Sequence, residues 1–255
     1  MIALTIDCEQ WTPLLRENTP HYNNVLFSKE GNDKLLKIFK KFDVKATFFI
    51  TGFFAERFPK QVKKIHSQGH EIASHGYNHH YRNSRIIIEK DIKKSKDVIE
   101  SIIGEKIYGF RAPQAQYSLR LLKILNKLNF RYDSSLHPAF VPGFYNNIKY
   151  PLRPFVPCNI DVKEIPIGVM PYLKLPIGWL WMRNMGLWWT NIGVKLLLRE
   201  DIVPVLYFHS WEFTNFSSKQ LPFYYLRNVG NKFNAILNNF LETWKNQKFI
   251  TLSEI

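Results

Sequence analysis

The 255-residue sequence has few cysteines and no long apolar run. Two cysteines, Cys8 and Cys158, are too few for the disulfide framework of a small secreted protein. No uninterrupted apolar stretch reaches the length of about 20 residues that a membrane-spanning helix needs. No signal-peptide pattern is visible at the N-terminus, which favours a cytoplasmic location. Neither a linker nor a low-complexity segment divides the chain, so we expect a single domain over residues 1–255.

Acidic residues are also scarce relative to basic ones. The chain carries 21 Asp and Glu against 35 Lys and Arg, for a net charge of +14. A basic balance favours anionic partners, but the lysines are spread over the predicted outer faces of helices. No nucleic-acid-binding motif accompanies the charge, so we predict no nucleic-acid partner. Hydrophobic residues make up 45% of the chain, which is enough for a large core and excludes a disordered protein.

Apolar runs typical of buried strands alternate along the chain with amphipathic segments typical of helices. The predicted strands cover residues 2–6, 46–50, 71–74, 107–110, 130–132, 164–167, 204–208 and 249–252. The predicted helices cover about 33–42, 59–68, 84–103, 119–128, 190–199 and 223–245. This alternation predicts a parallel α/β sheet or barrel. Residues 136–189 show little hydrophobic periodicity and have many prolines up to Pro176, so we expect a loop excursion there.

Reactive side chains follow the predicted strands at the points where the strands end. They are Asp7, Glu9, His75, His79, Arg111, Asp133 and His209. Because the carboxyl ends of parallel strands meet at one rim, we expect these side chains to converge there. Among them, His75 and His79 are four residues apart, a spacing at which two imidazoles can bind one ion.

A carboxylate would complete a metal site of two histidines and one acid, which leaves positions open for water. Asp7 and Glu9 are two residues apart in an extended segment, so their side chains should point the same way. One can bind the metal, and the other can accept a proton from the attacking water, with Arg111 keeping it ionised. His209 is suited to protonate a leaving amine, with Asp133 on its other ring nitrogen. Such a set suits amide hydrolysis.

Five segments resemble, in order, the five motifs of the polysaccharide deacetylases, the NodB-homology or carbohydrate esterase family 4 group. They are residues 5–9, 74–79, 110–113, 132–135 and 206–212. The Asp-x-Glu first motif is most similar to the branch found with exopolysaccharide biosynthesis. The resemblance implies a deformed (β/α) barrel of about seven repeats. It also implies a metal-dependent hydrolase that removes N-acetyl groups from amino sugars of a polysaccharide or a lipid-linked saccharide.

The resemblance also implies roles for individual residues. Asp7 resembles the catalytic base, Arg111 the arginine that orients it, His75 and His79 the metal histidines, and Asp133 with His209 the pair that supplies the acid. Zinc is the expected ion, although cobalt, nickel, manganese and iron also accept such ligands.

The sequence departs from the family's pattern at two positions. Most members have a second aspartate directly after the first, and Cys8 stands there. Glu9 resembles the metal ligand of the variant branch, and the side chain of Cys8 should point away from it. Gln114 follows Pro113 where the family has tyrosine, although its backbone N–H could still serve an oxyanion. We take Pro113, Gln114 and Trp211 as candidate substrate-binding residues.

Four of the seven tryptophans lie between Trp179 and Trp189. They can pack as a core or rim, form a wall on which a sugar stacks, or contact a membrane surface, where Trp is favoured. Together with the basic charge, the last possibility suggests a lipid-linked amino sugar handled at the inner face of a membrane.

Two other functions stay open from the sequence. The first is hydrolysis of a small amide or of a formyl-amino sugar, which a closed pocket would favour over an open groove. The second is a non-catalytic sugar- or lipid-binding protein that lost its metal through the change at Cys8. The presence of Asp7, Arg111, Asp133 and His209 argues against the second, because a binding protein needs no proton-transfer set.

Overall fold

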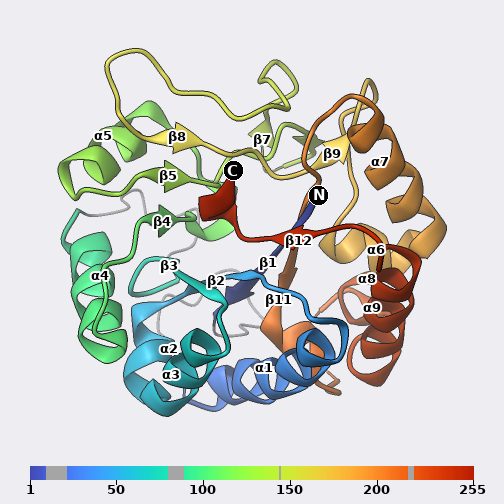
Figure 1. Cartoon of the computed structure of the whole chain (residues 1–255), viewed down its shortest axis with the longest axis horizontal. Helices are drawn as coiled ribbons and strands as arrows, with labels where there is room; N and C mark the ends of the chain where they lie inside the picture. Colours follow the sequence, from blue (N-terminus) through green and yellow to red (C-terminus); the bar gives the residue numbers. More distant parts are fainter. Residues whose placement is uncertain (10–21, 80–88, 144, 218–220) are drawn as a thin grey trace.

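A computed structural model describes residues 1–9, 22–79, 89–143, 145–217 and 221–255. Strands occupy the inside of the molecule and helices surround them (Figure 1). The strands of the main sheet are β1 (Ile2–Cys8), β2 (Thr47–Ile50), β3 (Glu71–Ser74), β4 (Gly109–Phe110), β5 (Tyr132–Asp133), β8 (Lys163–Glu164), β11 (Val205–His209) and β12 (Phe249–Ile250). The helices are α1 (Tyr22–Phe42), α2 (Gly52–Arg57), α3 (Pro59–Ser67), α4 (Glu89–Ile103), α5 (Leu119–Lys127), α6 (Trp179–Met185), α7 (Leu187–Arg199), α8 (Phe223–Leu226) and α9 (Asn231–Thr243).

The main sheet runs in the order β11-β1-β2-β3-β4-β5-β8, and all of its pairings are parallel. The last strand, β12, pairs with Ile2 and Ala3 at the start of β1. Beyond β8 the chain returns to the other edge of the sheet, where Gly168 N donates to Val205 O at 2.8 Å. Parallel strands inside a layer of helices confirm the predicted deformed (β/α) barrel.

Successive side chains of β1 point to opposite faces of the sheet, as in any strand. Ala3 packs inside with Phe49, Ala73 and Val205. The residues between belong instead to the core under the helices: Ile2, Leu4, Ile6 and Cys8. Odd-numbered residues of β1 therefore face the interior of the barrel, and this parity includes Asp7 and Glu9.

Side chains cap the start of helix α5, which the sequence predicts, and of helix α2, which it does not. The hydroxyl of Thr51 accepts from Phe54 N at the start of α2, and that of Ser118 accepts from Leu121 N at the start of α5. Such caps satisfy N–H groups that have no partner within the helix. Helix α1 starts at Tyr22, earlier than predicted, and Gly230 (φ 67°) separates α8 from α9 where one helix was expected. The predicted start of α4 at residue 84 lies outside the described residues.

The segment 136–189 contains more structure than the predicted loop excursion. It includes β6 (Phe140–Val141) paired with β7 (Tyr145–Asn146), and β9 (Val169–Met170) paired with β10 (Leu175–Pro176). It also supplies β8 to the main sheet and ends in α6, which was not predicted. Three 3₁₀ turns complete the described chain: η1 (Pro113–Ala115), η2 (Ser210–Phe213) and η3 (Leu252–Glu254). None of the helices described combines the length and hydrophobicity needed to cross a bilayer.

Candidate active site

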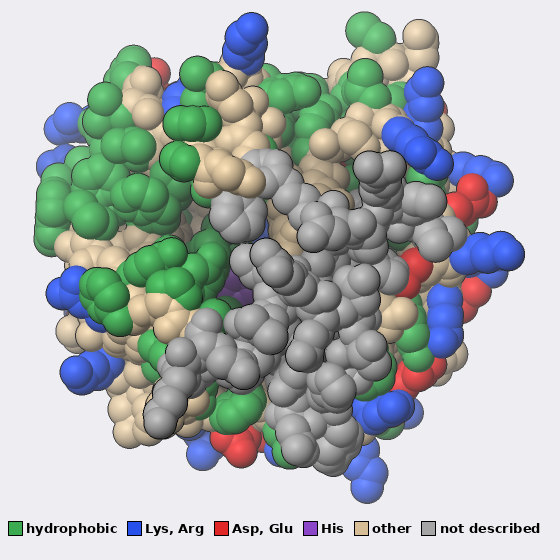
Figure 2. Space-filling model, turned by 180° about the vertical axis from the view of Figure 1, so that it is seen from behind, with side chains coloured by type: hydrophobic (Ala, Val, Ile, Leu, Met, Phe, Trp, Pro, Cys, Tyr) green, Lys and Arg blue, Asp and Glu red, His purple; other side chains and the backbone are tan. Residues whose placement is uncertain are grey.

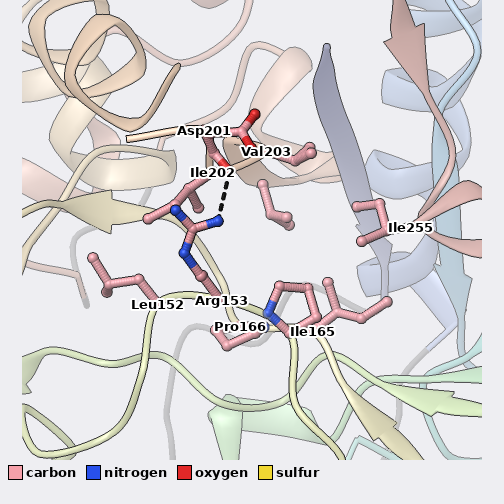
Figure 3. Close-up of a pocket in the computed structure, with 10 residues that line it drawn as sticks. Leu152, Arg153, Ile165, Pro166, Asp201, Ile202, Val203 and Ile255 are labelled. Carbon is pink, nitrogen blue, oxygen red and sulfur yellow. Dashed lines mark hydrogen bonds between the residues drawn. The ribbon is translucent and has the colours of Figure 1, made fainter. Parts of the chain in front are cut away.

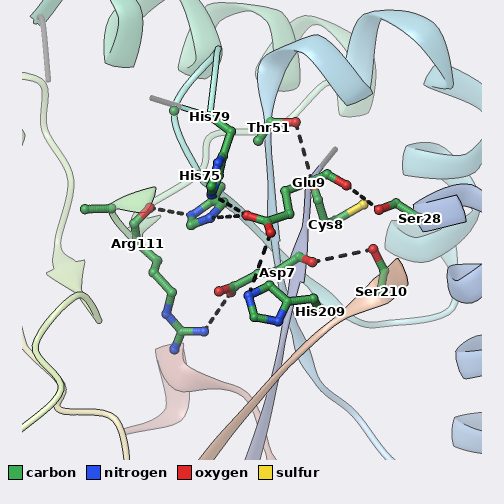
Figure 4. Close-up of polar contacts among 12 residues, drawn as sticks. Asp7, Cys8, Glu9, Ser28, Thr51, His75, His79, Arg111, His209 and Ser210 are labelled. Carbon is green, nitrogen blue, oxygen red and sulfur yellow. Dashed lines mark hydrogen bonds and ion pairs between the residues drawn. The ribbon is translucent and has the colours of Figure 1, made fainter. Parts of the chain in front are cut away.

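The strand register places the predicted site residues at one rim of the barrel. Asp7 and His209 are partners across β1 and β11. On the other side, Ser74 pairs with Phe110, so His75 and Arg111 each follow the last paired residue of neighbouring strands. Figure 4 shows these side chains pointing toward one another from the ends of β1, β3, β4 and β11. Six of the seven predicted residues meet there: Asp7, Glu9, His75, His79, Arg111 and His209.

Arg111 fixes the position of Asp7 through an ion pair of 2.8 Å between Nη1 and Oδ1. The same guanidinium donates to Thr5 Oγ1 at 2.8 Å and to Ser134 O at 2.8 Å. Both charged side chains are buried. A buried pair held by several charge-assisted hydrogen bonds keeps a defined geometry, and removing one partner would leave an uncompensated charge.

Glu9, His75 and His79 offer ligand atoms that all lie within 4.8 Å of one another. The Nδ1 atom of His75 lies 2.7 Å from Arg111 O. A carbonyl oxygen only accepts, so Nδ1 carries the hydrogen and Nε2 presents its lone pair. That Nε2 faces the carboxylate of Glu9 at 3.3 Å, which brings two electron-rich atoms together. A cation bound between these two atoms would remove their repulsion, so the residues fit a divalent ion.

The carboxylate of Glu9 is stabilised in its charged form. Burial raises its pKa, but the nearby charges of His79 and His209 and the close contacts with the His75 and His79 rings lower it more. The pKa of Glu9 therefore lies well below its ordinary value. An ionised carboxylate is the form that binds a metal.

The predicted pairing of Asp133 with His209 is wrong. The Nδ1 atom of His209 lies 3.0 Å from Glu212 Oε1, and Nε2 lies 3.7 Å from Glu9 Oε1. Burial lowers the pKa of His209, but the charges of Glu9 and Glu212 and the Glu212 hydrogen bond raise it above the ordinary value.

The pleat of β5 explains the different position of Asp133. Asp133 follows Tyr132, which packs inside the barrel, and is in register with Phe110, which packs under the helices. Its side chain therefore turns away from His209, accepts from Ser135 Oγ at 2.6 Å and interacts with Glu164. Burial raises the pKa of Asp133 to about 6, and burial with the nearby charge of Asp133 raises that of Glu164 further. Two neighbouring buried carboxyl groups of this kind favour holding one proton between them.

Cys8 lies outside the candidate metal site, as its parity in β1 predicts. Its buried sulfur accepts from Asn32 Nδ2 at 3.0 Å, under α1. Burial raises the pKa of the thiol to about 12, so it remains protonated and is a poor metal ligand. The change from aspartate to cysteine at this position thus affects the packing under α1.

The predicted substrate-binding residues lie around this rim. Trp211 is 5% exposed, stacks on His209 with ring centroids 5.3 Å apart and directs Nε1 toward Glu9 Oε1 at 3.4 Å. Pro113 is buried and Gln114 is partly exposed in η1, where Gln114 has φ 57°. Contact of these three residues with a sugar stays a prediction.

The aromatic segment 179–189 lies mainly against the protein. The ring centroids of Trp179 and His209 lie 4.9 Å apart, and those of the stacked rings of Trp181 and Trp189 lie 6.2 Å apart. Among its tryptophans Trp188 is the exception, with 57% of its surface exposed. Figure 2 shows apolar side chains gathered over the α6–α8 side of the molecule, and histidine visible in a hollow nearby.

A separate pocket lies at the opposite end of the strands, where β11 begins (Figure 3). Val205, Ile165 and Ile255 line it together with Arg153, which donates to the Asp201 carbonyl at 2.8 Å. Its lining is largely apolar, with no cluster of acid–base groups among the described residues. The chemistry therefore belongs to the other rim.

Sequence reasoning missed that two charged residues next to the site, Glu212 and Arg183, support His209. Arg183 Nε donates to Glu212 Oε2 at 2.6 Å, and both side chains have no exposed surface. The signals were present: Glu212 lies three residues after His209, and Arg183 is the one charged residue in the apolar segment 178–189. A lone charge in such a segment indicates a buried, paired group.

Comparison with known proteins agrees with this geometry. The sequence profile described as polysaccharide deacetylase matches residues 1–132, more than half of the chain. The chain belongs to the polysaccharide deacetylase family. A peptidoglycan deacetylase of Helicobacter pylori is 36% identical over 123 residues, which cover 47% of this chain and 42% of that protein. The match thus spans less than half the length of that relative.

Solved structures with the same fold extend the similarity over the whole length of this polysaccharide deacetylase family member. A putative polysaccharide deacetylase from Mycobacterium smegmatis has a TM-score of 0.71 at 20% identity, covering 99% of this chain and 87% of its own. An allantoinase has a TM-score of 0.68 at 15% identity, with the same coverage of both chains, 99% and 87%. The same fold therefore also occurs in an enzyme that is named for another activity, allantoinase.

Proposed function

We propose that this chain is a metal-dependent hydrolase that removes N-acetyl groups from amino sugars of a polysaccharide or lipid-linked saccharide. One observation carries the proposal: three potential metal ligands, an arginine-bound aspartate and a histidine converge on one rim. A protein that only binds sugars would not need a base and an acid beside a metal site.

Each residue has a distinct task in this proposal. A divalent ion bound by Glu9, His75 and His79 would polarise the amide carbonyl and lower the pKa of bound water. Asp7 accepts the proton of the attacking water, and its ion pair with Arg111 aims its carboxylate at the site. His209 donates a proton to the leaving amine from Nε2, the ring nitrogen that faces Glu9.

Zinc is the proposed ion, because two imidazoles and one carboxylate with open positions form the usual ligand set of a hydrolytic zinc site. The Asp-x-Glu pattern of Asp7 and Glu9 supports a place in the exopolysaccharide branch of the family. Pro113, Gln114 and Trp211 are the proposed contacts to the sugar.

We also propose that the exposed side chains among residues 179–189 contact a membrane surface. Met185 and Trp188 are exposed on α6 and α7, next to Ile192. A lipid-linked substrate would bring these side chains to the lipid headgroups. Co-sedimentation with anionic vesicles should fall on Trp188→Ser, and equal sedimentation of both proteins would exclude this contact.

The decisive experiment measures metal content and acetate release together. We expect about one metal per chain in wild type and acetate from N-acetylglucosamine oligomers. The His75→Ala/His79→Ala variant should lose both, because two of three ligands are gone. Cys8→Ser is the matched control: it alters the neighbour of Glu9 and should keep the metal.

Each other outcome has a defined meaning. Metal without acetate from any N-acetylated sugar would redirect the proposal to a small amide or formyl-amino sugar, tested next with cyclic amides and N-formyl sugars. A folded wild type that binds no zinc after reconstitution would refute the hydrolase and favour a sugar-binding protein. Loss of metal in Cys8→Ser would contradict the assignment of the ligands.

A further inference from the structure

The imidazole of His209 is held between two tryptophans. Trp211 stacks on it with ring centroids 5.3 Å apart and an angle of 25°. Trp179 meets it edge-on, with centroids 4.9 Å apart and an angle of 67°. These contacts confine the plane of the ring, but they do not decide which ring nitrogen carries the hydrogen.

Glu212 makes that choice. Its Oε1 accepts from the backbone N–H of His209 at 2.7 Å and lies 3.0 Å from Nδ1 of the same residue. A carboxylate only accepts hydrogen bonds, so Nδ1 carries the hydrogen. The other ring nitrogen, Nε2, then points toward Glu9 and the candidate metal site.

Arg183 in turn fixes Glu212. Its Nε donates to Glu212 Oε2 at 2.6 Å, and its Nη1 donates to the carbonyls of Tyr225 and Arg227 at 3.0 and 2.7 Å. Both charged groups are completely buried. Burying them costs free energy that a hydrophobic pair of similar volume would avoid, so the pair suits a role in specifying geometry.

Helix α6 brings these contacts together. Trp179 and Arg183 lie one helical turn apart, so the helix touches the His209 ring with one residue and Glu212 with the other. Trp179 has φ 45°, a conformation that L-residues seldom adopt. A strained aromatic residue beside a reactive group is the kind of site where strain is retained for function.

We propose that Glu212 and Arg183 are positioning residues: they keep a hydrogen on Nδ1 of His209, so that the proton given to the leaving amine is carried on Nε2, the task that family resemblance gives to Asp133. The inference rests on the proposed function, because it concerns the proton donor of that reaction. The chain reaches the same arrangement of acid and histidine from a position three residues after His209 instead of from β5.

A double-mutant cycle tests this role. Glu212→Gln should lower kcat on an N-acetylglucosamine oligomer roughly 10- to 100-fold with little change in KM. The reason is that Glu212 orients the His209 ring and does not itself bind the substrate. In a His209→Ala background the same change should have no further effect, because Glu212 acts only through that ring. Hydrolysis of 4-nitrophenyl acetate should change little, because this leaving group needs no proton.

Two further variants supply the controls. Asn184→Ala removes hydrogen bonds from the residue next to Arg183 to the carbonyls of Leu180 and Tyr224, and should keep wild-type kinetics. Asp133→Asn should combine additively with His209→Ala, since its partners are Ser135 and Glu164. An additive effect of Glu212→Gln, or equal losses on amide and ester, would overturn the proposal.

A measurement on the ring itself does not depend on activity. Nitrogen-15 NMR of the zinc-loaded wild type should show His209 protonated at Nδ1, with the signal assigned from its loss in His209→Ala. Protonation of the neutral ring at Nε2 would refute the inference even if Glu212→Gln cannot be purified folded. The Nδ1–H form in a protein that releases no acetate would refute only the proposed function.

Discussion

The side chains of Cys8 and Glu9 point to opposite faces of β1, although the residues are neighbours in the sequence. Cys8 packs under the helices, and Glu9 faces His75 and His79 inside the barrel. The same alternation separates Asp133 from Tyr132 in β5. At the scale of single residues, parity in a strand thus decides which side chains reach the metal site.

The two cysteines should differ sharply in reactivity. Cys8 has no exposed surface and its thiol pKa is raised to about 12, whereas Cys158 is exposed. We expect one thiol per chain to react with Ellman's reagent in the native protein and two after unfolding, because the thiolate is the nucleophile. The Cys158→Ser variant should show no reaction before unfolding. Rapid reaction of a native thiol in that variant would mean that Cys8 is accessible.

The residues that sequence reasoning identified are those for which local rules suffice. Asp7 and Glu9 share a face because they are two apart, and His75 follows a strand of clear pattern. The partner of His209 departs from the family pattern, in which an aspartate such as Asp133 pairs with the histidine, because Glu212 lies three residues away in η2. The contact of Asp133 with Glu164 joins two strands 31 residues apart, and no local signal specifies which strands become neighbours.

At the scale of elements, α1 supports the turn that carries His209. Gly31 packs against the backbone of Ser210, the first residue of η2, and a Cβ added there would lie 1.7 Å from Ser210 O. Thr214 Oγ1 donates to Phe27 O at 2.9 Å in the same contact. The glycine permits a close approach between the helix and the turn that positions His209 and Glu212.

Gly31→Ala should therefore destabilise the protein. In an ordinary helix this change adds about 1 kcal/mol of stability, but here the new methyl group would force α1 away from η2. We expect a loss of about 1–3 kcal/mol in the free energy of unfolding, with lower acetate release. Urea unfolding measures the first quantity. Lys37→Ala, at an exposed position of α1, should leave both near wild type; a stabilised Gly31→Ala would show that the contact is looser.

Helix α6 was not predicted, and its start explains why. It begins after Gly178 without a side-chain cap, its first residue has positive φ, and Gly186 ends it after two turns. The apolar segment 178–189, with four tryptophans, shows no clear hydrophobic period. Only contacts with Glu212 and His209, distant in sequence, select the helix.

At the scale of the whole molecule, stability should depend on pH through buried histidines. His70 lies between Phe39 and Phe48 and its Nδ1 accepts from Ala46 N at 3.3 Å. Burial, with a smaller contribution from Lys45, lowers its pKa from 6.5 to about 4. Burial likewise lowers the pKa of His137 to about 3, so both rings are neutral in the folded protein.

In the unfolded chain His70 should become protonated near pH 6.5, whereas in the folded chain it becomes protonated only near pH 4. The unfolded state then binds more protons in this window, so stability falls as the pH falls, by about 1 kcal/mol per pH unit for one histidine. His70→Asn keeps an acceptor for Ala46 N and should reduce this slope, measured by urea unfolding at pH 7, 6 and 5. His66→Asn, near the end of α3, should retain it, and an unchanged slope in His70→Asn would assign it elsewhere.

The division of the site along the chain has a consequence for how such proteins diversify. Glu9, His75 and His79 lie within residues 1–132, the part that matches the family profile, whereas Arg183, His209 and Glu212 lie beyond it. Relatives recognised by that first half can share a metal centre and still differ in how they protonate a departing nitrogen. Changes that suit another leaving group, from basic sugar amines to less basic amides, would then be expected beyond residue 132, with Glu9, His75 and His79 retained.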